Sequence, residues 1–201
     1  MSELVINTFV DTVDMQEAHV EAMFEGCVIF TRALGVSFDL NIDKLSPLKD
    51  VERSDAPKML SNTFPAIISD IESGLTRTQI SDVLREGLFI VTTGQDLRAP
   101  GVNFCFGYAD LARAAIVSSC NNLSPSAFRN IVAHELGHLA AMVGTNWSNH
   151  DNRGGLYEGH CKNPCIMRQV MSLGEAKKTA AEIDCFCDDC LGHLQRVGQL
   201  I

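Results

Sequence analysis

The amino-acid sequence predicts a mixed fold, α+β or α/β, and three observations carry this prediction. In the first half of the 201 residues, short strand-like runs alternate with longer runs of helical periodicity. The apolar share of 46% is typical of a chain that folds around a core, which excludes disorder of the whole chain. The second half is irregular and rich in glycine and cysteine. A chain of this length favours a single compact domain.

The predicted strands are short runs that are apolar or that alternate between apolar and polar residues. They cover residues 4–10, 36–42, 88–93, 102–108 and 114–119. The polar segment 43–62 contains two prolines and is predicted to be a long loop. Pro100 and Gly101 mark a turn before the fourth strand.

The predicted helices have apolar residues at a spacing of three or four. They cover residues 14–34, 64–86, 124–143 and 173–184, and the second of them is interrupted near a glycine. Asp14 and Glu17 form a capping box at the start of the first helix, and His19 is predicted to lie on its surface. Ser124 is a suitable N-cap for the third helix, because Pro125 fits the first helical position.

Composition and charge exclude several classes of partner. The formal net charge of −9 argues against nucleic acid or an anionic membrane as the main partner. No run of about 18 apolar residues is present, which argues against a membrane span. The first residues lack a basic stretch followed by an apolar one, so a signal peptide is not expected. We therefore expect a cytoplasmic protein. The sequence indicates no oligomeric state.

One motif carries chemistry, the His-Glu-Leu-Gly-His sequence at residues 134–138. Side chains four residues apart lie on one face of a helix, so His134 and His138 can bind one ion. The apolar stripe of the predicted helix leaves both histidines off its buried face. Glu135 can accept a proton from a water that zinc acidifies. The motif predicts a peptidase in which Glu135 assists the attack of a zinc-bound water on the peptide bond.

A catalytic zinc needs a third protein ligand and an open position for water. The candidates that follow the helix are histidines and carboxylates: His150, Asp151, Glu158, His160 and Glu175. A carboxylate ligand would indicate a zinc peptidase of another clan, of the gluzincin type. A further alternative is a zinc-stabilised binding module in which the motif is latent. Tyr157 is a candidate for stabilising an oxyanion.

Five of the eight cysteines lie in the last 41 residues. Cys187 and Cys190 have the spacing of a zinc knuckle, and Cys161 and Cys165 would complete a tetrahedral set. Cys185 is a spare thiol or replaces Cys187, and His193 could also replace one cysteine. The cysteines that stand alone are predicted to be small buried hydrophobes: Cys27, Cys105 and Cys120.

The order of these motifs resembles the archaemetzincin family. The resemblance rests on the zinc helix, His160-Cys161, Cys165-Ile166-Met167 and Cys187-x-x-Cys190, and on the stretches 88–97, 100–109 and 114–119. It covers roughly residues 88–190. The chain departs from the family pattern in residues 142–159, which separate the helix from His160 and include Trp147. It also departs in the three-residue spacing of the first two cysteines.

The resemblance implies a metzincin-like zincin fold: a mixed twisted sheet, a backing helix, the motif helix and a small cysteine-rich C-terminal subdomain. It implies an N-terminal subdomain 1–144 and a C-terminal subdomain 145–201. Residues 114–119 would form the edge strand above the cleft, and its substrate-binding residues would be Ala115, Ile116 and Val117. Met167 would form the Met-turn beneath the metal, with Met171 as the second candidate.

The resemblance also implies two zinc ions per chain. His134, His138 and His160 would bind the catalytic ion, with Glu135 as the general base. A structural ion would be held by four thiolates: Cys161, Cys165, Cys187 and Cys190. The partner would be a peptide or protein substrate. Because Cys161 follows His160 directly, we expect the loss of Cys187 to weaken both metal sites.

Overall fold

The computed structural model describes the chain in ten stretches: 3–11, 15–45, 55–63, 87–99, 102–110, 114–120, 123–140, 147–153, 159–170 and 172–199. The strands are β1 (Glu3–Asp11), β2 (Ser37–Leu45), β3 (Leu88–Thr93), β4 (Leu97–Ala99), β5 (Val102–Cys105), β6 (Gly107–Asp110) and β7 (Ala114–Ser118). The helices are α1 (Glu17–Leu34), α2 (Ala56–Thr63), α5 (Pro125–Leu139), α6 (Leu173–Glu182) and α7 (Asp188–Gly198). The predicted mixed fold is confirmed.

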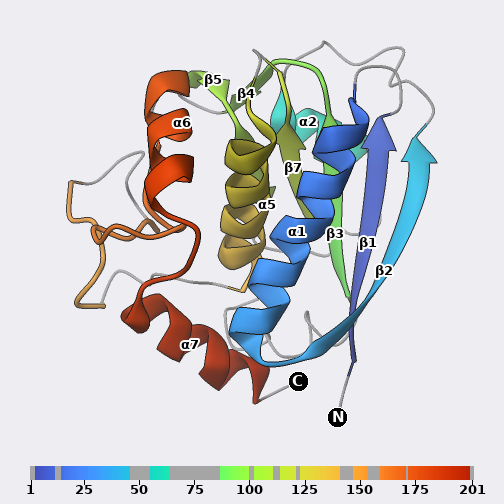
Figure 1. Cartoon of the computed structure of the whole chain (residues 1–201). Coiled ribbons are helices and arrows are strands. Elements are labelled where there is room, and N and C mark those ends of the chain that lie inside the picture. Colours follow the sequence, from blue (N-terminus) through green and yellow to red (C-terminus); the bar gives the residue numbers. More distant parts are fainter. Residues whose placement is uncertain are drawn as a thin grey trace.

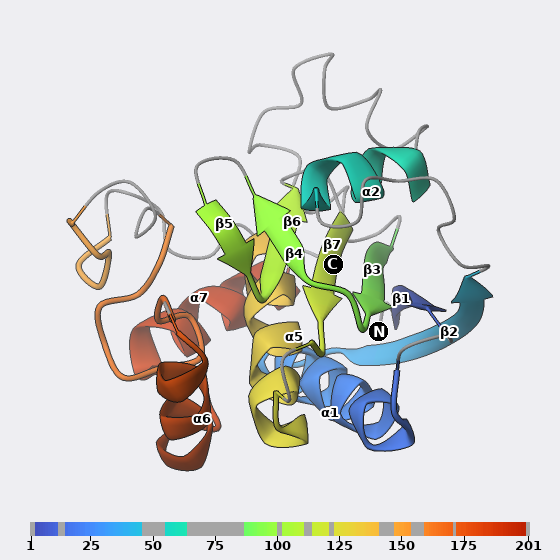
Figure 2. The same cartoon turned by 90° about the horizontal axis from the view of Figure 1, so that it is seen from above.

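A five-stranded sheet organises the described part of the chain, in the order β2-β1-β3-β7-β6. The first four strands pair in parallel, and β6 pairs with β7 in the antiparallel sense. Strands β4 and β5 form a separate antiparallel pair. Helices α1 and α5 lie side by side on one face of the sheet, and α2 lies on the other (Figures 1 and 2).

The main core lies between the sheet and the pair α1 and α5. Phe30 of α1 and Phe128 of α5 are fully buried there. Gly26 lets the two helices approach closely, since a Cβ atom at this position would lie 2.7 Å from the Cβ atom of Val132. Gly35 ends α1 in the left-handed conformation, with φ of 75°. Close packing against α1 and the sheet therefore fixes the position of helix α5 and of the motif on it.

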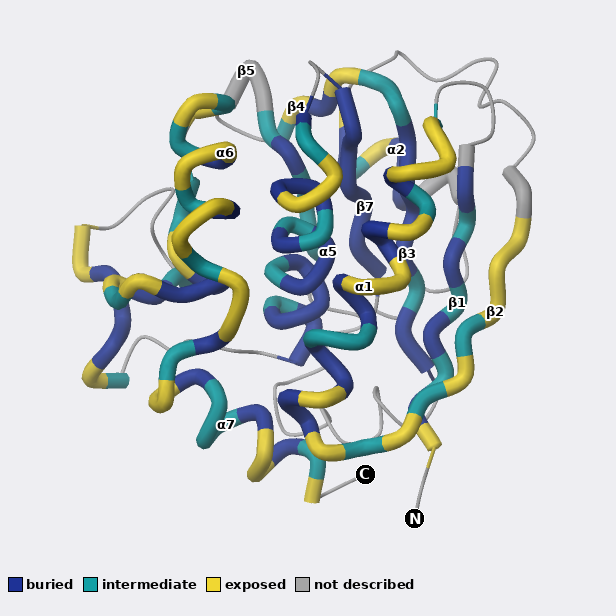
Figure 3. Tube along the Cα trace, viewed as in Figure 1, coloured by how far each residue is buried: buried dark blue, intermediate teal, exposed yellow. Residues whose placement is uncertain are grey.

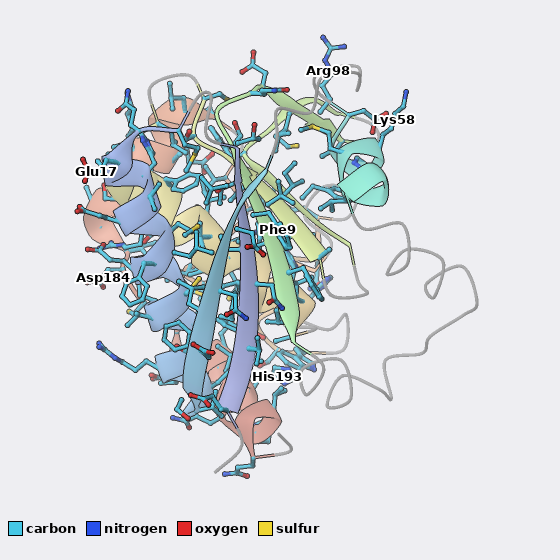
Figure 4. The ribbon with its side chains drawn as sticks, turned by 90° about the vertical axis from the view of Figure 1, so that its right-hand side faces the viewer. Phe9, Glu17, Lys58, Arg98, Asp184 and His193 are labelled. Carbon is cyan, nitrogen blue, oxygen red and sulfur yellow. The ribbon has the colours of Figure 1, made fainter. Side chains whose placement is uncertain are left out.

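A smaller apolar cluster covers the opposite face of the sheet. Met59 and Leu60 of α2 are buried in it, and Phe9 of β1 packs against it from the sheet. Figure 4 views the sheet from its β2 side, with Glu17 on α1 at one face and Phe9 over the other. Both faces of the central strands are thus covered, as expected for parallel strands.

Three helix predictions need correction. Helix α2 replaces the end of the predicted loop 43–62, because the proline at its second residue fits a first helical turn. Helix α7 was not predicted, and it begins among the clustered cysteines and aspartates. Helix α1 begins at Glu17 with Gln16 as N-cap rather than at Asp14. The predicted helix 64–86 lies outside the described residues.

The predicted edge strand is also wrong. Strand β7 pairs with β3 on one side and with β6 on the other, so its backbone lies inside the sheet. Its residues Ala115, Ile116 and Val117 are fully buried, which removes them as substrate-binding residues. Figure 3 shows β7 buried along its length. The strand at this end of the sheet is β6, because the predicted strand 102–108 divides into β5 and β6 at Phe106.

The position of His19 also differs from the prediction. It is buried rather than exposed, and its Nε2 atom lies 2.9 Å from the carbonyl oxygen of Leu123. Its ring also meets the ring of Phe128 edge-on. The histidine therefore ties α1 to the segment that precedes α5. Among the described helices, none is long and apolar enough to span a bilayer.

Candidate metal centres

Three histidine rings converge at the motif helix. The Nε2 atom of His138 lies 3.0 Å from the Nε2 atom of His134 and 3.3 Å from the Nε2 atom of His160. Nitrogen ligands at about 2.05 Å from a tetrahedral zinc are separated by about 3.3 Å. These two distances, and the position of all three ligand atoms within 4.8 Å of one another, fit one zinc ion.

Helix α5 places two of these rings. Ser124 caps the helix, accepting a hydrogen bond from the backbone nitrogen of Ala127, and Pro125 occupies its first turn. His134 and His138 follow one helical turn apart and share a face. The Nδ1 atom of His134 lies 2.7 Å from the carbonyl oxygen of Ile166. This hydrogen bond leaves Nε2 for an ion.

The protonation state of the rings suits a metal ligand. Burial lowers the pKa of His134 below its ordinary value of 6.5. Burial, together with the charges of His134 and His160, lowers the pKa of His138 further. Neutral imidazole is the form that binds metal ions. All three rings are half-buried, so the centre lies at the border of the protein.

Glu135 lies beside this centre on the side of strand β6. Its side chain is 6% exposed, and burial raises the pKa of its carboxyl to about 8. A Cβ atom added at Gly107 of β6 would lie only 2.7 Å from the Cδ atom of Glu135. The absence of a side chain at Gly107 thus leaves the space that the carboxyl group fills.

His160 joins the two helical histidines, and His150 does not. The ring of His150 is buried elsewhere, with Nδ1 3.1 Å from the Oδ1 atom of Asn152. Asp151 forms a salt bridge with Arg153. Glu175 lies in the first turn of helix α6 and is not part of the donor cluster. Glu158 and Tyr157 lie outside the described residues, as does Met171.

A second cluster brings four sulfur atoms together. The Sγ atoms of Cys161 and Cys187 lie 3.7 Å apart, and so do those of Cys165 and Cys190. Four sulfur ligands at about 2.3 Å from a tetrahedral zinc are separated by about 3.8 Å. The four sulfur atoms fit one zinc ion. Cys185 is exposed and lies outside this cluster.

The chain is similar in sequence to curated archaemetzincins. It is 28% identical over 114 residues to the protein of Nanoarchaeum equitans, which is 57% of this chain and 56% of that one. It is 33% identical over 112 residues to the protein of Methanopyrus kandleri, which is 52% and 53% of the two chains. The match thus spans a little over half the length of these relatives. No protein-family model matches the chain.

Solved structures extend the similarity over almost the whole chain. A zinc-dependent peptidase from Methanocorpusculum labreanum aligns with a TM-score of 0.63 and 23% identity, over 94% of this chain and 99% of that one. The Methanopyrus kandleri archaemetzincin aligns with a TM-score of 0.62 and 22% identity, over 98% and 96%. The chain has the archaemetzincin fold. The structural similarity therefore includes the N-terminal strands and helix, which lie outside the sequence resemblance over residues 88–190.

In this archaemetzincin-like chain, the segment around Met167 links the two clusters. Met167 is fully buried, and its carbonyl oxygen accepts a hydrogen bond of 2.8 Å from the backbone nitrogen of Cys161. The neighbouring Ile166 carbonyl accepts the bond from His134 described above. The backbone of 161–167 therefore contacts both candidate centres. The placement of Met167 beneath a metal stays a prediction.

Of the other predicted residues, His193 is not in the cysteine cluster. Its ring packs on Trp147, with ring centroids 4.1 Å apart, and its Nε2 atom lies 3.4 Å from the carbonyl oxygen of Ala140. Figure 4 shows His193 near the lower end of the molecule, on α7. Cys27 and Cys120 are buried as predicted, whereas Cys105 is half-buried.

Two residues that shape these centres carry no motif in the sequence. Gly107 makes room for Glu135, and only the pairing of β6 beside α5 reveals this role. Asn149 is 1% exposed and places its amide nitrogen against two sulfur atoms of the cysteine cluster. Asn149 lies in the segment 142–159, where the chain departs from the family pattern, so no motif marked it.

Proposed function

We propose that the chain is a zinc-dependent peptidase. The convergence of three histidine Nε2 atoms beside a buried carboxyl group carries this proposal. The sequence similarity to archaemetzincins, and the structural similarity to a protein described as a zinc-dependent peptidase, support it.

In this proposal His134, His138 and His160 hold the catalytic zinc. The zinc would supply Lewis acidity, which polarises a carbonyl group and makes water a stronger acid. Glu135 takes a proton from the attacking water and passes it to the leaving amine. Its carboxyl group must be ionised to start this cycle. A nearby cation favours the ionised form and so opposes the effect of burial on its pKa.

The substrate would bind as an extended peptide along β6. This strand ends the described sheet and lies beside helix α5, with Gly107 against the carboxyl group of Glu135. Pairing with a sheet edge holds a peptide by its backbone, largely independently of its side chains. Strand β6 replaces β7 in this role, because of these two strands only β6 lies at an edge of the described sheet.

A second zinc would be held by the cysteine cluster and would have a structural role. Four thiolates leave no open position for a substrate. The cluster needs reduced thiols, and its four cysteines form no disulfide bonds, so a reducing cytoplasmic location is part of the proposal.

The decisive experiment replaces the proposed base. Glu135→Ala should abolish cleavage of a mixed peptide library, while zinc content measured by mass spectrometry stays at the wild-type level. Glu182→Ala is the matched control, because it removes an exposed carboxylate on α6. Cleavage retained by Glu135→Ala would overturn the assignment of the base.

The identity of the third ligand needs its own test. His160→Ala should lose about one zinc per chain, whereas His150→Ala should keep the wild-type content, because only His160 lies with the helical pair. Loss of zinc in His150→Ala alone would contradict the proposed ligand set. Retention of all zinc in both variants would favour a carboxylate as third ligand.

A further inference from the structure

The segment 147–151 runs against the cysteine cluster. His150 and Cys161 form an antiparallel bridge. The backbone nitrogen of Asp151 donates a hydrogen bond of 2.9 Å to the carbonyl oxygen of His160, and that of Lys162 donates one of 2.9 Å to the carbonyl oxygen of Asn149. These two bonds lie on either side of Cys161. The segment therefore holds the stretch that carries both the third histidine and the first cysteine of the cluster.

The side chain of Asn149 enters the cluster itself. Its Nδ2 atom lies 3.3 Å from the Sγ atom of Cys161 and 3.2 Å from the Sγ atom of Cys190. A primary amide has two N–H donors, so each sulfur atom can receive one of them. The side chain is 1% exposed. A buried amide group with both donors directed at sulfur atoms is suited to thiolates, which accept hydrogen bonds but cannot donate them.

The charge of a loaded cluster explains the need for such donors. Four thiolates around one zinc ion carry a net charge of −2, and three of these cysteines are buried. Hydrogen bonds from amide groups spread this charge and orient the ligands. Asn163 contributes from the exposed side, with its backbone nitrogen 3.4 Å from the Sγ atom of Cys161 and its Nδ2 atom 3.6 Å from that of Cys187. Asn149 provides the matching donors from the buried side.

We propose that Asn149 is a positioning residue of the cysteine cluster, which makes zinc binding there and docking of the segment 147–151 one coupled event. The coupling has a consequence for the histidine centre, because the docked segment also holds the backbone of His160. This inference rests on the proposed zinc at the four cysteines. It assigns a task to the part of the chain that departs from the archaemetzincin pattern.

The protein contains its own reporter of docking. Trp147 is the single tryptophan of the chain, and it lies two residues before Asn149. Its ring packs on His193 of α7, with centroids 4.1 Å apart. Helix α7 also carries Cys190, one of the two sulfur partners of Asn149. Zinc titrated into the metal-free wild-type chain should therefore change tryptophan fluorescence in step with filling of the cysteine cluster.

The test compares the full chain with variants of Asn149 and of Asn152, the residue that follows the segment 147–151. Asn149→Asp replaces the amide donors by a carboxylate that faces thiolates, and Asn149→Leu removes the donors at similar size without adding charge. Asn152→Asp is the matched control, since Asn152 is exposed and the substitution adds the same charge as Asn149→Asp. Cobalt loading gives a sulfur-to-metal charge-transfer band that only the cysteine cluster can produce. Zinc transfer to a chelating dye gives the release rate.

Loss of a hydrogen-bond partner of metal ligands usually lowers the metal affinity by about 10–100-fold. We therefore expect both Asn149 variants to release zinc from the cluster faster than wild type by roughly this factor. Their cobalt band should shift, and their tryptophan signal should no longer follow metal loading. Asn152→Asp should match wild type in all three measurements. Circular dichroism of the metal-loaded proteins identifies a variant that is unfolded. If one Asn149 variant is unfolded, the other is used for the comparison with wild type.

Two outcomes would overturn the inference, and they are distinguishable. Wild-type release rates in both Asn149 variants, with the cobalt band of wild type, would remove Asn149 as a positioning residue and leave the zinc proposal intact. Absence of the charge-transfer band in the wild-type chain would show that the four cysteines bind no metal, and the inference would fall with that part of the proposed function.

Discussion

The Nδ1 atom of His134 lies 2.7 Å from the carbonyl oxygen of Ile166, the residue between Cys165 and Met167. The backbone nitrogen of Ile166 in turn donates a hydrogen bond of 3.1 Å to the carbonyl oxygen of Cys185. One residue thus contacts the histidine centre with its carbonyl group, while its neighbour contributes a sulfur atom to the cysteine cluster. The two candidate centres are joined by backbone as well as through His160-Cys161.

This connection predicts that damage to the cysteine cluster reaches the histidine centre. Cys187→Ser should lower the zinc content by more than one ion per chain, because loss of the proposed structural ion would free the backbone that orients His134 and His160. The measurement is zinc per chain by mass spectrometry after dialysis against a weak chelator. Hydrogen-bond partners of metal ligands are worth about 10–100-fold in metal affinity, so the proposed catalytic ion should be lost at chelator concentrations that wild type tolerates.

Cys185→Ser is the control for this change. It removes an exposed thiol only two residues away, which lies outside the group of four. It should leave the zinc content at the wild-type level. A Cys187→Ser protein that loses one ion only, and keeps peptidase activity, would show that the two centres are independent.

The histidine motif shows what local sequence can predict. The spacing of His134 and His138 on a capped, striped helix determines which face they share, and helix α5 confirms that reading. The cysteine spacing also identified four sulfur atoms that lie together in the structure. These predictions succeed because they depend on residues a few positions apart or on the chemistry of a tetrahedral ligand set.

Strand order and long-range contacts are not local properties, and the predictions that depended on them were wrong or absent. The family resemblance implies an edge strand at 114–119, and nothing in these residues indicates that β6 pairs on their outer side. Asn149 meets Cys190 across 41 positions. Helix α7 did carry a signal, since Cys190, Leu194 and Val197 recur at helical spacing and are buried. In that stretch the cysteine spacing predicts metal ligands and does not by itself predict a helix.

The close contact between Gly107 and Glu135 predicts that a side chain at position 107 displaces the proposed base. In Gly107→Ala, the new Cβ atom would overlap the carboxyl group of Glu135, with Cγ and Cδ 2.7 Å away, so the carboxyl group must move. A displacement of about 1 Å can cost on the order of 100-fold in rate. We expect kcat on a peptide substrate to fall by about that factor, with zinc content unchanged.

Gly174→Ala tests whether any glycine substitution has this effect. A Cβ atom at Gly174 would have no neighbour within 4 Å, and the position lies in the first turn of α6. This variant should keep wild-type kcat and should be slightly more stable, because alanine favours the helix. Wild-type kcat in Gly107→Ala would mean that Glu135 does not need its observed position.

The buried carboxyl group of Glu135 predicts a pH dependence of stability in the metal-free protein. Burial raises the pKa of this group from 4.5 to about 8. Between these values the unfolded chain releases the proton and the folded chain keeps it, so the contribution of Glu135 to stability falls as pH rises. Glutamine stays neutral at every pH. Glu135→Gln should therefore stabilise the metal-free protein, by an amount near zero at pH 4.5 that grows up to about pH 8.

Urea unfolding at several pH values measures this difference. Each unit of pKa shift is worth about 1.4 kcal/mol, so the advantage of Glu135→Gln should reach a few kcal/mol at pH 8 and stay constant above it. Zinc loading should shrink the difference, because a cation near the carboxyl group favours its ionised form. The opposite trend, an advantage that falls between pH 4.5 and 8, would mean that the folded protein stabilises the ionised carboxylate even without metal.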